Sequence, residues 1–183
     1  MQQPSERSDV TEGVVDRFER VVLPHLDDAY TLARYLVRDE HDAQDVVQDA
    51  ALRALRYFEG FSGGDARAWL LAIVRNCALD WRRRYRLDER SVPFDEVVHG
   101  PATASRSADA AAIEESEQHR VQRALGTLPL EFREVIVLRE VQELRYREIS
   151  DVLGVPIGTV MSRLARARRQ LAALLHPDTR EVS

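Results

Sequence analysis

The chain has 183 residues, of which 44% are hydrophobic, so it can bury a core as one domain or as two small ones. Its formal net charge is −5, and its single cysteine, Cys77, excludes an intramolecular disulfide. Because Cys77 lies in an apolar run at 70–79, we predict a buried structural thiol in a protein of a reducing compartment. No long apolar segment is present, and the first ten residues lack an apolar core, so we expect a cytoplasmic protein that is neither exported nor embedded in a membrane.

The charge is distributed in blocks along the chain. All 26 basic residues are arginines, and the net charge is −6 over 1–60, +3 over 61–90, −5 over 91–143 and +3 over 144–183. Two basic blocks indicate two separate contacts with a polyanion. The acidic blocks predict weak general DNA binding by the free chain and a surface on which a basic partner docks.

The N-terminal half shows a helical pattern throughout. After a polar stretch at 1–12, for which we expect disorder, Pro24 should kink or interrupt the first amphipathic helix. Residues 39–42 break the pattern again, and Asp42 with Asp45 can cap a helix that runs to about Phe58. A loop at 61–65 then precedes a helix from about 67 to 84.

The second half begins with a stretch that carries no sustained period. Helical pattern returns near Ile113 and restarts at Pro129, while no strand-like alternation or internal repeat is present. We therefore predict an all-α protein of two small helical domains, at 13–88 and 116–176. A flexible linker at 89–115 would join them, and 177–183 would form a tail.

The stretch from 146 to 171 predicts a helix-turn-helix. Gly154 supplies the permissive backbone for the turn, and Pro156 fixes φ where the second helix should begin. One face of that helix is apolar: Val160, Leu164, Ala167 and Leu171. The opposite face holds Gly158, Ser162, Ala165, Arg166 and Arg169. A helix-turn-helix places such an outward face in the DNA major groove, whereas the plainer alternative is a helical bundle with a solvated basic surface.

Three segments, in this order, resemble the bacterial RNA polymerase sigma factors of the extracytoplasmic-function (ECF) type. They are Asp-Ala-Gln-Asp-Val-Val-Gln-Asp at 42–49, Ala-Trp-Leu-Leu-Ala-Ile-Val-Arg-Asn at 68–76, and the stretch at 128–164. Two departures are small: Gln44 stands where the family usually has an acid, and Ser150 where it commonly has alanine. The resemblance implies a polymerase-binding helix, a promoter-melting helix and a C-terminal DNA-binding domain.

The first segment, by resemblance, docks on the coiled-coil clamp of the polymerase β′ subunit. Its spacing combines charge with apolar area on one helix face, although each acid taken singly could be merely solvated. The implied polymerase-binding residues are Asp45, Val46, Gln48, Asp49, Leu52 and Arg53.

The second segment is expected to contact the minus-ten element. Asn76 is our candidate for hydrogen bonding to a base, and Phe61 for contact with an unstacked base. Phosphate contacts are expected from Arg75, Arg82, Arg83, Arg84 and Arg86. The arginine run could also be a solvated helix end. Trp69 and Trp81 share a face with apolar residues, so we expect them in the core.

The third segment is expected to read the minus-thirty-five element. Ser162 and Arg166 are the candidates for base edges, while Met161 and Ala165 could meet thymine methyls. The expected phosphate contacts are Arg145, Arg147, Thr159, Arg163, Arg168 and Arg169.

The implied partners are core RNA polymerase, through its β′ and β subunits, promoter DNA and an anti-sigma factor. No cofactor, metal, small-molecule substrate or catalysis is expected, because the five histidines show no metal-ligand spacing and no Gly-rich loop follows a strand. The competing interpretation is a stand-alone helix-turn-helix regulator with residues 14–86 as a dimerisation or ligand domain. The basic helix that carries Asn76 argues against it, since a dimerisation domain does not need such a helix.

Overall fold

The structure is a computed structural model that describes residues 5–91 and 117–176, with side chains described over 13–85 and 120–176. The N-terminal elements are α1 (Ser5–Val22), η1 (Leu23–His25), α2 (Leu26–Val37), α3 (Glu40–Tyr57), η2 (Phe58–Gly60) and α4 (Ala66–Ser91). The C-terminal elements are α5 (Glu117–Thr127), α6 (Leu130–Ile136), the π-helical turn η4 (Val137–Val141), α7 (Tyr146–Leu153) and α8 (Ile157–Leu175). Within the described ranges no strand occurs, so the predicted all-α class is confirmed. Most of the predicted linker, from 92 on, and the tail at 177–183 lie outside the described residues.

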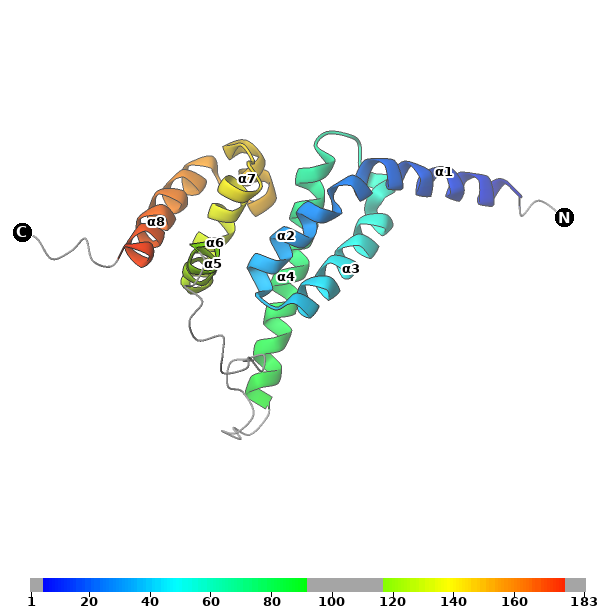
Figure 1. The fold of residues 1–183 in the computed structure, drawn as a ribbon. Coiled ribbons are helices and arrows are strands. Elements are labelled where there is room, and N and C mark those ends of the chain that lie inside the picture. The colour runs from blue at the N-terminus through cyan, green and yellow to red at the C-terminus, as the bar shows by residue number, and fades with distance from the viewer. Residues whose placement is uncertain (1–4, 92–116, 177–183) are drawn as a thin grey trace, which may run out of the picture.

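Helices α2, α3 and α4 pack together as the N-terminal bundle, and α1 extends away from it (Figure 1). Pro24 interrupts the helix as predicted, in the short 3-10 turn η1 between α1 and α2. Helix α1 begins already at Ser5, inside the stretch for which we expected disorder; residues 5–22 contain no proline that would interrupt a helix.

The N-cap of α3 is Asp39, which the sequence pattern did not identify. Arg38 adopts a left-handed φ of 75° after α2, and the Asp39 carboxylate then accepts hydrogen bonds from the backbone N–H groups of His41 and Asp42. Asp39 is therefore the N-cap of α3. Asp42, which we expected to cap this helix, lies within its first turn instead, where its charge still suits the helix dipole.

The helix-turn-helix forms as predicted. Gly154 ends α7 in the left-handed conformation with a φ of 64°, and α8 begins directly after Pro156. The Ser150 hydroxyl donates to the Val155 carbonyl at 2.6 Å and closes the turn from inside. Val160, Leu164 and Ala167 are buried, which confirms the inner face of α8.

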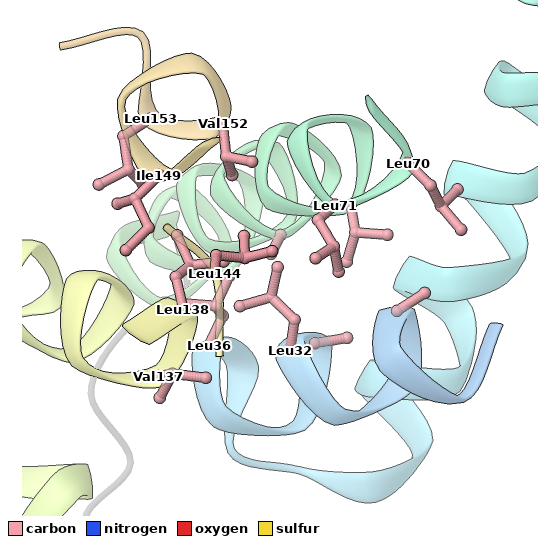
Figure 2. Packing of buried hydrophobic residues seen from close by; sticks show 14 of the residues in the cluster. Leu32, Leu36, Leu70, Leu71, Val137, Leu138, Leu144, Ile149, Val152 and Leu153 are labelled. Carbon is pink, nitrogen blue, oxygen red and sulfur yellow. The ribbon is translucent and has the colours of Figure 1, made fainter. Parts of the chain in front are cut away.

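The two helical units pack against each other. Leu32 and Leu36 of α2, Leu71 of α4, and Leu138 and Leu144 of the C-terminal unit point toward one another in one continuous apolar cluster (Figure 2). Helix α7 lies directly on α4, and α6 and η4 contact α2. The sequence did not predict this contact, because its partners are separated by about a hundred residues and follow no local pattern.

Arg133 is a buried arginine at the same junction. It is 4% exposed and donates to the carbonyls of Leu125, Gly126 and Leu128, which satisfies the C-terminal end of α5, and its Nη1 reaches the Tyr35 carbonyl at 3.4 Å. Burial, with smaller contributions from the positive charges of Arg38 and Arg82, lowers the pKa of Arg133 to about 10, so it remains charged at neutral pH.

Candidate nucleic-acid and protein interfaces

The outer face of α3 offers both charge and apolar surface. Asp45 and Gln48 are exposed, Asp49 is half-buried, and Leu52 is 61% exposed, which is unusual for a leucine with a folded core available. Arg53 is held in place by Asp49 at 2.9 Å and by Asp80 of α4 at 3.1 Å, so its guanidinium ties α3 to α4.

Two residues of this helix differ from the expectation. Val46 is 3% exposed, so in the folded bundle it supports α3 from the core and offers no surface to a partner. Leu55, an apolar residue that would ordinarily be buried, is 37% exposed and follows Leu52 at i+3 spacing. Leu55 therefore enlarges the exposed apolar surface of α3; the sequence signal was present, but helical spacing alone does not tell an outward leucine from a buried one.

The loop before α4 carries an aromatic cluster. Phe61 is half-buried, with its ring centroid 5.9 Å from that of Phe58 and 4.9 Å from that of Trp69. Phe58 is fully buried and meets Phe18 edge-on. Trp69, which we expected in the core, is half-buried against this cluster, so that prediction is only partly confirmed. Phe61 is already packed on two rings, and its half-buried state leaves part of its surface accessible.

The outer face of α4 is basic. Asn76 is exposed one turn before Asp80, and Arg83 and Arg84 are exposed beyond it. The Asp80 carboxylate within this face is paired with Arg53 at 3.1 Å and lies 3.8 Å from Arg83. Asn76 therefore shares its face with arginine charge and with an acid that is already engaged.

The remaining arginines of α4 differ in what they contact. Arg82 donates to the Leu36 carbonyl at 3.0 Å and so helps to hold α4 on α2. Arg75 is only 17% exposed and pairs with Glu134 of α6, with 2.9 Å between Nε and Oε2 and 3.2 Å between Nη2 and Oε1. Arg86 lies just beyond residue 85, the last residue of α4 whose side chain the structure describes. Trp81 stacks on Tyr85 with centroids 5.2 Å apart, and is half-buried rather than fully in the core.

The outward face of α8 is open. Met161 is 54% exposed, and Ser162, Ala165, Arg166 and Arg169 are exposed, as predicted. Thr159 is half-buried at the start of the helix, and Arg145 and Arg147 are exposed on the α7 side. Arg166 and Arg169 also border a groove lined by Thr127 and Leu128, at the junction with α5.

Two arginines of this domain are engaged by acids. Arg168 forms an ion pair with Glu140, with 2.6 Å between Nη2 and Oε1. Arg163 is 26% exposed and has its Nη1 3.7 Å from Oε1 of Glu134. Glu134, at 3% exposed, therefore lies between an arginine of α4 and an arginine of α8.

The described residues contain no group of three or more His, Cys, Asp or Glu side chains placed to hold a metal ion. Over the same residues, no helix is both long and apolar enough to cross a membrane. Burial raises the pKa of the Cys77 thiol to about 11, in line with the predicted structural role of this residue.

These features define a class of protein: an all-helical chain whose two units each present an arginine-bearing outer helix, one of them the second helix of a helix-turn-helix. The sigma-70 region 2 family matches residues 21–87, and the sigma-70 region 4 family matches residues 118–171. The chain belongs to the sigma-70 family, within the ECF group of RNA polymerase sigma factors. Members of this family are transcription initiation factors and not enzymes.

Three similar proteins illustrate the relationship. The RNA polymerase sigma-H factor of Pseudomonas aeruginosa is 33% identical over 94% of this chain and 93% of its own length. The ECF sigma factor SigE of Mycolicibacterium smegmatis is also 33% identical over 94% of this chain, which spans 66% of that relative. The sigma factor RpoE of Bartonella quintana, solved in complex with the anti-sigma factor NepR, matches the fold with a TM-score of 0.68 and 29% identity, covering 88% of this chain and 98% of that one.

Proposed function

We propose that this chain binds core RNA polymerase, directs it to specific promoters and helps to melt the minus-ten region. The observation that carries the proposal is the pairing, in one chain, of an exposed Asn76 on a basic α4 with an exposed Ser162 face on α8. One duplex-reading helix suffices for a repressor, whereas a second basic helix with a base-reading amide suits a protein that also handles an opened strand.

The polymerase contact is proposed on the outer face of α3, with the β′ subunit as the partner. Asp45, Gln48 and Asp49 offer hydrogen-bond acceptors, and Leu52 with Leu55 supplies the apolar area that anchors an interface. The contact of the C-terminal domain with the β subunit is proposed from the resemblance alone.

Promoter melting is proposed at α4 and the loop before it. An amide such as that of Asn76 offers a donor and an acceptor to a base edge, and Arg83 and Arg84 are positioned to neutralise phosphates nearby. A flipped base could stack on the accessible part of the Phe61 ring, at the edge of a cluster that holds the ring in position.

Recognition of the minus-thirty-five element is proposed on α8. Ser162 and Arg166 would contact base edges and Met161 and Ala165 thymine methyls, because all four are exposed on the outer face of the second helix. Arg145, Arg147 and Arg169 would fix the register through phosphates.

Regulation by an anti-sigma factor in the cytoplasm is part of the proposal. The similar RpoE of Bartonella quintana was solved in complex with the anti-sigma factor NepR, and this chain matches that protein over most of its length. Co-purification from the native host tests this part: an inhibitor protein recovered with the chain supports it, and a chain recovered free under every growth condition counts against it.

A mobility-shift assay with and without core polymerase tests the proposed function. We expect specific, tight promoter binding only when core polymerase is present, and a loss of about tenfold or more in the Asn76→Ala variant with its fold intact, since Asn76 is exposed. Tight, specific binding to duplex DNA by the chain alone as a dimer would instead identify a stand-alone helix-turn-helix regulator.

A further inference from the structure

The contact between the two helical units engages an arginine for which the sequence predicts a contact with DNA. Arg75, an expected minus-ten phosphate contact, forms a two-pronged ion pair with Glu134 across the domain junction. The same carboxylate lies 3.7 Å from Arg163 of its own unit, an expected minus-thirty-five phosphate contact. One acid of the C-terminal domain thus engages one DNA-directed arginine from each domain.

The ion pair between Arg75 and Glu134 is largely shielded from water and has the geometry of an arginine–phosphate contact. Its side chain is 3% exposed, and that of Arg75 is 17% exposed, so water screens their attraction poorly. A carboxylate presents two oxygens to a guanidinium in the same forked geometry as a phosphate. Glu134 therefore occupies Arg75 in the manner in which a DNA phosphate would.

A second polar network holds the same junction. Arg67 of α4 donates to Asp28 at 2.6 Å, and to both the backbone carbonyl and the side-chain oxygen of Gln142 at 2.8 and 2.7 Å. The Gln142 amide in turn donates to the Asp28 carbonyl at 3.0 Å. Gln142 is 1% exposed, and among the described side chains no buried nitrogen or oxygen atom lacks a partner, so the junction is a satisfied interface.

This packing is incompatible with simultaneous contact at both promoter elements. Two DNA sites about two helical turns apart are separated by roughly 70 Å. Two touching domains of about 60–75 residues have centres only about 30 Å apart. The domains must therefore separate before both can engage one promoter, and separation breaks the Arg75–Glu134 pair.

We infer that this conformation is an autoinhibited state, in which Glu134 acts as an internal phosphate substitute that latches the two DNA-binding domains together. The inference rests on the proposed function, because the latch is inhibitory only if Arg75 and the two outer helices contact promoter DNA. Opening exchanges the Glu134 carboxylate for DNA phosphate at Arg75, whereas the contact of Glu134 with Arg163 lies within the C-terminal unit and does not depend on opening. The latch predicts weak DNA binding by the free chain, through a defined contact in addition to the acidic net charge.

The test combines small-angle X-ray scattering of the full chain with titration of run-off transcription by core polymerase. Glu134→Gln keeps the shape of the side chain but removes its charge, and Gln142→Ala weakens the junction while leaving Glu134 in place. The matched control is Glu131→Gln, which removes the same charge from an exposed position on the same helix.

Both junction variants should raise the open-to-closed ratio at least about tenfold, because breaking one partner of a buried pair or network is costly. The radius of gyration should rise by roughly 5 Å or more. Half-maximal transcription should need several-fold less protein, and Glu131→Gln should match the parent chain. Circular dichroism should show unchanged helix content in every variant.

The opposing outcomes are distinct. Unchanged scattering and unchanged transcription titration in both junction variants, with an active parent chain, would overturn the latch and leave the proposed function intact. Expanded scattering with no gain in transcription would overturn the inhibitory role. Absence of core-dependent transcription by the parent chain and all variants would refute the proposed function and the autoinhibition together.

Discussion

Gly154 occupies the one backbone position of the helix-turn-helix that requires a left-handed conformation, with a φ of 64°. A Cβ there would meet no atom within 4 Å, so the cost of Gly154→Ala is conformational rather than steric crowding. We expect a loss of about 1 kcal/mol in the free energy of unfolding, measured by denaturant titration. The control is Gly158→Ala in the first turn of α8, which should be neutral or stabilising by up to about 1 kcal/mol. Equal effects of the two substitutions would contradict this interpretation.

Cys77 gives the fold a pH dependence in the alkaline range. Burial raises the pKa of its thiol from 9.0 to about 11, so the folded state holds this proton more tightly than the unfolded state does. Its contribution to stability is present below pH 9 and is lost as the pH rises through about 11. The stability difference between the parent chain and Cys77→Ala should therefore shrink from pH 8.5 to pH 11, by up to roughly 2 kcal/mol. A pH-independent difference would show that the thiol does not titrate in this way.

Helix α3 exposes two leucines on a bundle that has a well-filled core. Leu52→Arg should weaken binding to core polymerase by about tenfold or more, measured by fluorescence anisotropy, because it places a charge where the proposed apolar anchor lies. Its effect on the free energy of unfolding should stay within about 0.5 kcal/mol, since Leu52 is exposed. Leu23→Arg, at another exposed leucine in η1, should leave polymerase binding unchanged. Equal binding by the two variants would remove α3 from the interface.

The helix-turn-helix allows phosphate contacts to be told from base contacts. Arg147→Ala should weaken holoenzyme binding to all promoter sequences alike, and should lower the slope of log affinity against log salt by about one. Ser162→Ala should change sequence preference and leave that slope unaltered, because a hydroxyl displaces no counterion. An unchanged salt slope in Arg147→Ala would mean that this exposed arginine does not contact phosphate.

At the scale of elements, the sequence predicts best where structure is local. Pro24, Gly154 and Pro156 each act on the backbone at their own positions, and the breaks they predict occur there. The cap of α3 was misplaced from Asp39 to Asp42, because either acid precedes a helical pattern and only the hydrogen bonds from His41 and Asp42 identify the cap. The π-helical turn η4 also lacks a local signal, since residues 137–141 continue the apolar pattern of α6.

At the scale of the whole molecule, the sequence predicts two helical units but not their contact. Arg75 and Glu134 are 59 positions apart, and Arg67 and Gln142 are 75 apart, so no periodicity links them. The same limit applies to the candidate sites. The outward faces of α4 and α8 follow from helical spacing, whereas the engagement of Arg75 by an acid, the burial of Val46 and the exposure of Leu55 depend on which surfaces meet.

The packing of the two units brings together charges from different blocks of the sequence. Acidic and basic blocks alternate along the sequence, and in the folded state an acid of the C-terminal domain is paired with an arginine of the N-terminal basic block. Separation of the domains therefore exposes Arg75 and adds to the positive potential of the N-terminal basic helix, which the net charge of −5 does not reveal.

Run-off transcription from genomic fragments of the native host, with purified core polymerase and with or without this chain, tests the central claim most directly. The account predicts discrete transcripts that appear only when the chain is added, and that disappear when Asn76 and Ser162 are both replaced by alanine. The same transcripts made by core enzyme alone, or none made with the chain present, would contradict it.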